Sequence, residues 1–219
     1  MSEIITTYLL KDPETPIPMK REEFYAEQIK SAKAGKKPFR ASESVYIFLF
    51  NKHKELFVQK RSYKKGHNPG LLDKSIGGHV SYGNTPDYTV MVETVQELQT
   101  PSIVLKDRVD FLKTLKLLND YLSTIAVVCH LKDKIYVSPK TIDKKSVNIA
   151  VKAHIYLGVY EGRIRPADRE AKGILQYSLP ELKSEMKNSP ETFTRDMHFL
   201  LKDLGPDIKK FLSLVSKTK

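Results

Sequence analysis

Residues 77–99 have the sequence "GGHVSYGNTPDYTVMVETVQELQ", which is the most informative segment of the chain. It opens with two glycines, crosses a Thr-Pro pair and continues with helical periodicity. Thr85 is a good N-cap residue, and Pro86 suits the first position of a helix. Five of the ten glycines lie within residues 66–83, so the backbone there turns repeatedly or approaches something closely. The sequence predicts a glycine loop that leads into a helix beginning near Pro86.

The predicted helix has two different faces. An apolar stripe recurs on one of them, as in an amphipathic helix: Tyr88, Met91, Val95 and Leu98. Glu93 and Glu97 lie four residues apart and project from the opposite face, with Gln96 beside them. Neighbouring carboxylates repel unless a cation lies among them, and oxygen ligands suit Mg²⁺ or Mn²⁺. A solvated acidic face is the alternative, and two glutamates alone would favour it.

The elements around this helix indicate an α/β protein. Residues 44–62 predict two strands joined by a turn at residues 51–54, and a helix beginning at Glu22 precedes them. After Pro101, residues 109–122 predict a second amphipathic helix. Further β-rich segments occupy residues 123–131, 134–138 and 146–162.

The C-terminal part of the chain is predicted to be helical. Ser178 and Glu181 form a capping box, and Thr194 is a candidate cap for a later helix. The segment 199–217 has helical periodicity, but it contains Gly205 and Pro206, so we expect the last helix to break or kink there.

Composition limits the class of protein. The 219 residues contain 37 Lys and Arg against 26 Asp and Glu, a formal charge of +11, which favours partners such as diphosphates, nucleotides or RNA. The single cysteine, Cys129, lies in an apolar segment and is expected to be buried. The N-terminus does not read as a signal peptide and no apolar segment is long enough to span a bilayer, so we expect a cytoplasmic protein without a membrane partner.

The glycine loop and helix resemble the Nudix box, the metal-binding motif of Nudix hydrolases. Counting from Gly78, the register holds without a gap, and Glu93 and Glu97 coincide with two of the family's glutamates. Four signature positions are changed: Asn84, Val92, Gln96 and Gln99 replace Glu, Arg, Glu and Gly. The wider stretch from residue 45 to residue 86 is similar to the branch of Nudix proteins near isopentenyl diphosphate isomerase, and "REAKGILQYSLPEL" and "FTRDMHFLL" extend the match to residue 201.

This resemblance implies an α/β (α+β) Nudix fold, a mixed sheet sandwiched between helices, with an inserted helix near 105–122 and added terminal helices. Residues 1–43 are predicted to be an N-terminal extension that packs on a Nudix domain at 44–219. The resemblance also implies a site for Mg²⁺ or Mn²⁺, with Glu93 as ligand or base and three further metal ligands: Gln96, Glu97 and Glu170. Because Gln96 lacks a negative charge and Val92 removes an arginine that positions the catalytic glutamate, metal affinity is expected to be lower than in the family.

Several other residues are candidates for binding the substrate. Arg61 and Lys60 are placed to contact a diphosphate, although an outward strand face is the alternative. Gly77 and Gly78 allow a close approach of the backbone. His79 is a candidate for contact with substrate or metal but is more often structural when it has no second ligand. Tyr82 either stacks on a base or covers the loop.

Three functions are compatible with the sequence. The first is a Nudix hydrolase that cleaves a diphosphate linkage in a small molecule, such as a nucleoside diphosphate derivative, with capped RNA as another candidate. The second, an isopentenyl diphosphate isomerase, is set aside because Ile76 and Gly77 occupy the place of that family's cysteine. The third is a non-catalytic Nudix-fold module that binds nucleotide, RNA or protein. The oligomeric state is open, with a homodimer as one alternative.

Overall fold

The computed structural model describes residues 2–142, 145–163 and 171–216. Glu170, which the sequence nominates as a metal ligand, lies outside the described residues. Within them, ten strands form one mixed sheet, whose main path runs β10-β4-β3-β9-β8-β7. The strands are β1 (Ile4–Leu9), β2 (Asp12–Lys20), β3 (Arg40–Phe50), β4 (Leu56–Arg61), β5 (Leu72–Asp73), β6 (Ile76–His79), β7 (Ser102–Leu105), β8 (Ala126–Ile142), β9 (Lys145–Val159) and β10 (Ala171–Tyr177).

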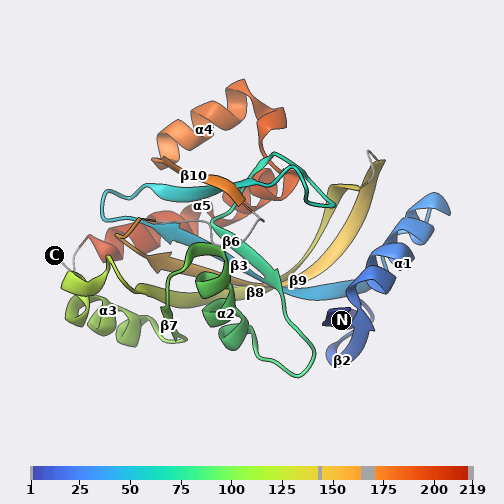
Figure 1. Ribbon diagram of the computed structural model, residues 1–219, viewed down its shortest axis with the longest axis horizontal. Coiled ribbons are helices and arrows are strands. Elements are labelled where there is room, and N and C mark those ends of the chain that lie inside the picture. The colour runs from blue at the N-terminus through green and yellow to red at the C-terminus, as the bar shows by residue number, and fades with distance from the viewer. Residues whose placement is uncertain (1, 143–144, 164–170, 217–219) are drawn as a thin grey trace.

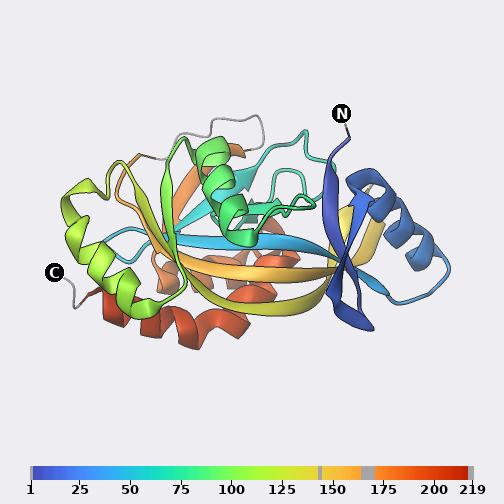
Figure 2. The same cartoon turned by 90° about the horizontal axis from the view of Figure 1, so that it is seen from below.

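Helices cover both faces of this sheet. They are α1 (Arg21–Lys33), α2 (Pro86–Leu98), α3 (Arg108–Leu117), α4 (Leu179–Asn188) and α5 (Arg195–Val215), with short 3-10 turns at Asn119–Tyr121 and Pro190–Thr192. Figure 1 shows the order of the elements, and Figure 2 shows α2 on one side of the central strands and α5 on the other. The predicted α/β sandwich with an inserted helix is confirmed.

The core has two parts, one on each face of the sheet. Alternate residues of β3 point to opposite sides: Phe48 packs with the cluster that includes Leu204 and Ile208 of α5, whereas Ile47 packs with Val90 and Leu98 of α2. All six side chains are at most 1% exposed. This alternation is the expected pattern for a strand that is buried on both faces.

β3 and β4 separate soon after their turn. They pair only at Phe50 and Leu56, after which β6 and β9 take the edges of β3 while β5 and β10 take those of β4. Ser75 lies in the opening: its hydroxyl accepts from the Leu49 N–H at 2.9 Å and donates to the Phe57 carbonyl at 2.6 Å. The hairpin prediction is therefore correct at the turn, but the two strands diverge beyond Phe50 and Leu56.

The segments before β3 join the same sheet. β1 pairs with β2 and with the start of β3, and α1 then crosses near the end of the sheet (Figure 1). Tyr25 of α1 contacts His79 of β6 through its hydroxyl, at 3.3 Å from the imidazole Nε2. This packing places the N-terminal residues beside the glycine loop.

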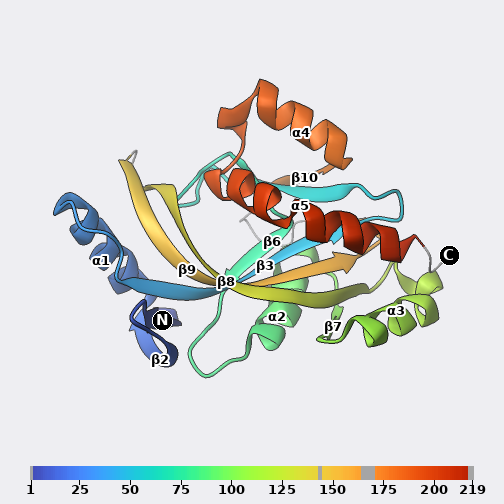
Figure 3. The same cartoon turned by 180° about the vertical axis from the view of Figure 1, so that it is seen from behind.

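The C-terminal helix does not break at Gly205 and Pro206, although a break was one of the two expected outcomes. α5 runs without a break from Arg195 to Val215, with Pro206 inside it (Figure 3). Proline removes one backbone hydrogen bond, but the buried stripe continues on both sides of it, with Leu201 and Leu204 before and Ile208 and Phe211 after. Packing on the sheet therefore maintains the helix across the proline. Its N-terminus is capped by Thr194, as predicted.

The face of α2 that packs on the sheet is also a correction. Three of the four residues of the predicted apolar stripe are exposed: Tyr88, Met91 and Val95 are each close to half exposed, whereas Leu98 is buried as predicted. The buried residues are Thr89, Val90, Thr94, Glu97 and Leu98. Their polar groups have local partners, because the Thr94 hydroxyl lies 2.9 Å from that of Ser102 and Gln59 donates to Glu97 at 3.1 Å. The helix therefore buries a mixed face whose hydrogen bonds are satisfied.

In the described ranges, no helix is long and apolar enough to cross a membrane.

Candidate active site

A cavity of about 270 Å³ lies where β3 and β4 separate. Its walls come from the N-terminal hairpin and α1, from the strands β3 to β6, from α2, and from β8 and α5. Six residues nominated from the sequence line it: Arg61, Gly77, Gly78, His79, Glu93 and Gln96. The fold thus gathers most of the candidate site into one polar cavity.

Gly78 and Glu93 fit against each other at the cavity wall. A side-chain Cβ at Gly78 would overlap the carboxylate of Glu93, so the missing side chain leaves the space that this carboxylate occupies. Gly78 lies in β6, paired with Val45 of β3, which fixes its backbone. The glycine of the motif therefore has a packing reason, and it positions the Glu93 carboxylate at the cavity.

The three acidic or amide positions of α2 are in different environments. Glu93 is half-buried and Gln96 is exposed, and both line the cavity. Glu97 is only 2% exposed, does not line this cavity, and accepts a hydrogen bond from Gln59 of β4. Glu93 and Gln96 thus present oxygen atoms to the cavity, with the Glu97 carboxylate buried next to them in the helix.

A buried charge network forms the floor of the cavity. Asp73 lies 3.3 Å from Arg61 and 3.2 Å from Lys74, and it accepts a hydrogen bond from the Thr194 hydroxyl at 3.0 Å. Burial would raise the pKa of Asp73, but Lys74 and Arg61 outweigh it and hold this pKa well below its usual range. Asp73 is therefore ionised and fixes two cations in the cavity wall.

Arg61 retains hydrogen-bonding capacity in this network. Its two terminal nitrogens bond to Asp73 and to the carbonyl of His67, whereas its buried Nε has no partner among the described residues. Lys74 also lies 4.1 Å from the centre of the Tyr46 ring, a cation–π contact that holds its ammonium group beside the cavity. Both cations are thus held at the wall of the cavity.

A second ion pair reaches the cavity from the other end of the chain. Lys140 of β8 lies 3.8 Å from Asp196 of α5, and Ser138 donates a short hydrogen bond to the same carboxylate. Lys140 and Asp196 are both at most 9% exposed and line the cavity. This pair joins the start of α5 to the sheet next to the Asp73 network.

The two histidines of the cavity are neutral at physiological pH. Burial, together with Lys140 and Arg61, lowers the pKa of His67 to about 2, and burial and Arg21 hold the pKa of His79 well below its usual value. His79 contacts the Tyr25 hydroxyl, and the rings of Tyr25 and His67 lie 5.6 Å apart. The histidines therefore provide neutral hydrogen-bonding groups.

Two residues nominated for contact with the substrate, Lys60 and Tyr82, do not line the cavity. Lys60 lies in β4, where it pairs with Leu72 of β5 and Gly173 of β10. It does not line the cavity, although its neighbour Arg61 does. Tyr82 is about half exposed in the turn before α2 and is also outside the lining. Their proposed contacts with substrate remain predictions.

Sequence reasoning missed several residues of the cavity. Asp73 and Lys74 lie within the glycine-rich segment at residues 66–83, so their position offered a local signal. Lys140, Asp196 and Arg21 offered none, because strand pairing and helix packing bring them from distant segments. The sequence thus identifies the residues near the motif and not those that the fold adds.

The C-terminus of α2 supports the register of the motif. Gln99, at the position of the closing glycine, has φ 53° and ψ 32°, the left-handed conformation that glycine adopts most easily.

The family model for the NUDIX domain matches residues 41–197. The chain belongs to the Nudix family.

Two further proteins are similar to this chain. The isopentenyl-diphosphate Delta-isomerase of Serratia proteamaculans (strain 568) is 24% identical over 159 residues, 73% of this chain and 74% of that protein. The crystal structure of DR0079 from Deinococcus radiodurans is 17% identical and superposes with a TM-score of 0.53 over 74% of this chain and 82% of its own. The latter likeness supports the fold.

Proposed function

We propose that this protein is a divalent-metal-dependent hydrolase that cleaves a diphosphate linkage in a nucleoside diphosphate derivative or a related small molecule. The observation that carries the proposal is the position of Glu93: its carboxylate fills the space beside Gly78 in the same cavity as Arg61 and Lys74. A negative side chain for a metal and fixed cations for phosphate oxygens thus occur together.

The donors at the cavity fit a hard divalent cation. Mg²⁺ is commonly held by one or two carboxylates together with substrate phosphates, and the cavity offers the carboxylate of Glu93 and the neutral amide oxygen of Gln96. When bound, Mg²⁺ or Mn²⁺ would neutralise the charge of the diphosphate and make its phosphorus easier to attack. Glu97 is proposed as a further ligand, reached by a side-chain movement away from Gln59.

The chain's own residues would orient the substrate. Arg61 and Lys74, fixed by Asp73, are placed to hold the phosphate oxygens, since Arg and Lys both bind phosphate well. Glu93 would accept a proton from the attacking water. The water oxygen would form the new bond to phosphorus as the bridging phosphorus–oxygen bond breaks.

Specific features also support a non-catalytic binding module as the second candidate. Gln96 removes a negative charge from the metal site, Val92 removes an arginine, and Glu97 lies buried against Gln59. Such a module would use the same basic cavity to bind a nucleotide or RNA without turnover. Metal dependence separates the two candidates.

The test is turnover on a substrate panel. Purified full-length protein is incubated with nucleotide sugars, nucleoside diphosphates and triphosphates, dinucleoside polyphosphates, prenyl diphosphates and capped RNA, each with Mg²⁺, with Mn²⁺ or with a chelator. The hydrolase is supported by phosphate or nucleotide release that needs the metal. If no member of the panel is turned over and a nucleotide or RNA binds without metal, the protein is the binding module instead.

A further inference from the structure

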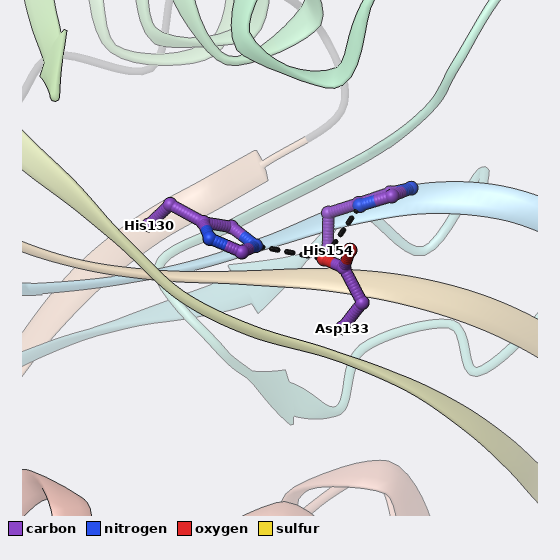
Figure 4. Close-up of side chains that lie close together, drawn as sticks. All are labelled: His130, Asp133 and His154. Carbon is purple, nitrogen blue, oxygen red and sulfur yellow. Dashed lines mark hydrogen bonds and ion pairs between the residues drawn. The ribbon is translucent and has the colours of Figure 1, made fainter. Parts of the chain in front are cut away.

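A cluster of two histidines and one aspartate lies on the α2 face of the sheet. His130 and Asp133 belong to β8 and His154 to β9 (Figure 4). The His130 Nε2 and the His154 Nδ1 each lie 2.7 Å from the same oxygen of Asp133. None of the three lines the cavity described above.

A β-bulge creates this arrangement. Residues 130 and 133 are three apart and would face opposite sides of a regular strand. The register of β8 shifts between His130 and Lys132, so His130 pairs with Tyr156 and Asp133 with His154, which are two residues apart on β9. The extra residue thus turns both side chains of β8 to the face that carries His154. Bulges often redirect side chains at functional sites.

The second nitrogen of His154 has a carboxylate partner. Its Nε2 lies 2.8 Å from Glu43 of β3, and the Tyr8 hydroxyl donates to the same oxygen at 3.1 Å. A carboxylate that orients an imidazole from behind is the usual outer shell of a metal-binding histidine, because it fixes the ring and increases its basicity. Glu43 and His154 are each at most 8% exposed, so this arrangement is built into the sheet.

Among the described residues, no lysine or arginine balances the carboxylates of this cluster; burial lowers the pKa of His154, but Glu43 and Asp133 outweigh burial and raise it. In the part of the chain that the structure describes, the ion pairs of Asp133 and Glu43 are with histidines and not with lysine or arginine. A neutral His154 carries one proton and so can donate to only one of its two carboxylates. The other nitrogen then faces an acceptor, and either a second proton on His154 or a metal cation at that point resolves the conflict.

We propose that His130 Nε2, His154 Nδ1 and the Asp133 carboxylate bind a divalent transition metal, with Glu43 orienting His154. The three donor atoms lie within 4.8 Å of one another, and a tetrahedral Zn²⁺ site needs separations of roughly 3.3 Å, so small side-chain rotations accommodate the ion. Two imidazoles with one carboxylate suit Zn²⁺ and similar ions rather than Mg²⁺. The Asp133 side chain is half exposed, which leaves room for water as a fourth ligand.

The test is Zn²⁺ binding by the full chain after treatment with a chelator, measured by competition with a chromophoric chelator in excess Mg²⁺. The wild type is expected to bind one Zn²⁺, and His130→Gln to weaken binding by at least roughly tenfold. His53→Gln, which alters an exposed histidine in the turn after β3, and Glu93→Gln, in the other site, are both expected to bind as the wild type does.

Thermal unfolding gives a second readout that does not depend on the competitor. With Zn²⁺ at about one hundred times its Kd, the melting temperature of the wild type should rise by roughly 5–10 °C, and Asp133→Asn should abolish this rise. A hydrogen-bonded cluster without a metal would give a wild type whose melting temperature does not respond to Zn²⁺. That result, or Zn²⁺ binding equally tight in His130→Gln and the wild type, would overturn the proposal.

Discussion

At the scale of single residues, the site depends on how Gly78 and Glu93 fit together. The glycine leaves the volume that the carboxylate fills, and strand pairing with β3 prevents the backbone of β6 from moving away. Near them, Asp73 holds Arg61 and Lys74 in the cavity wall. The side chain that would bind metal and those that would bind phosphate are therefore positioned by independent contacts.

Gly78→Ala tests this fit. The added methyl group would displace the Glu93 carboxylate, and activity or metal affinity should fall by roughly 10–100-fold, as when a group that positions a ligand is lost. The displaced atoms are the far end of a flexible side chain, so the free energy of unfolding should change by less than about 1 kcal/mol. Steady-state kinetics and denaturant unfolding measure the two quantities.

Gly173→Ala is the matched control for this substitution. Gly173 also lies in a strand, β10, and an added Cβ would meet no atom within 4 Å. Its activity should equal that of the wild type. Full activity in Gly78→Ala would show that the glycine does not position Glu93.

At the scale of elements, the termini of α2 follow the sequence better than its buried face does. Thr85 accepts a hydrogen bond from the Tyr88 N–H, and Pro86 begins the helix, as the local signals predict. The buried face was predicted wrongly because periodicity counts apolar residues, whereas Thr94 and Glu97 are buried with partners on β7 and β4. Such partners belong to other elements, so the spacing of residues within the helix does not reveal them.

Gln99→Gly tests the C-terminus of α2. Gln99 adopts a left-handed conformation that costs a residue with a side chain more than it costs glycine. The substitution should increase the free energy of unfolding by about 0.5–1 kcal/mol, measured in denaturant. Gln176→Gly, at an exposed position of β10, should decrease it instead, since glycine weakens a strand. A decrease in both variants would contradict the assigned strain.

At the scale of the whole molecule, the sheet gathers the candidate site from nearly the full length of the chain. The residues of the motif, Glu93 and Gly78, were predictable because a local pattern contains them, and the family fold followed from the same pattern. Lys140 and Asp196 were not, since only the pairing of β8 with β9 and the packing of α5 bring them to the cavity. The cluster of His130, Asp133 and His154 likewise depends on a β-bulge in β8, which the sequence pattern does not predict.

The central claim is that Glu93 supports metal-dependent hydrolysis of a diphosphate, and its most direct test is the rate of the wild type and Glu93→Gln over a range of Mn²⁺ concentrations. The substrate is the panel member with the highest turnover, and Glu191→Gln, an exposed glutamate near α5, is the control. The rate is expected to fall by roughly 10²–10⁴-fold in Glu93→Gln and to stay unchanged in Glu191→Gln. Equal rates in Glu93→Gln and the wild type, or no turnover by the wild type at any Mn²⁺ concentration, would contradict it.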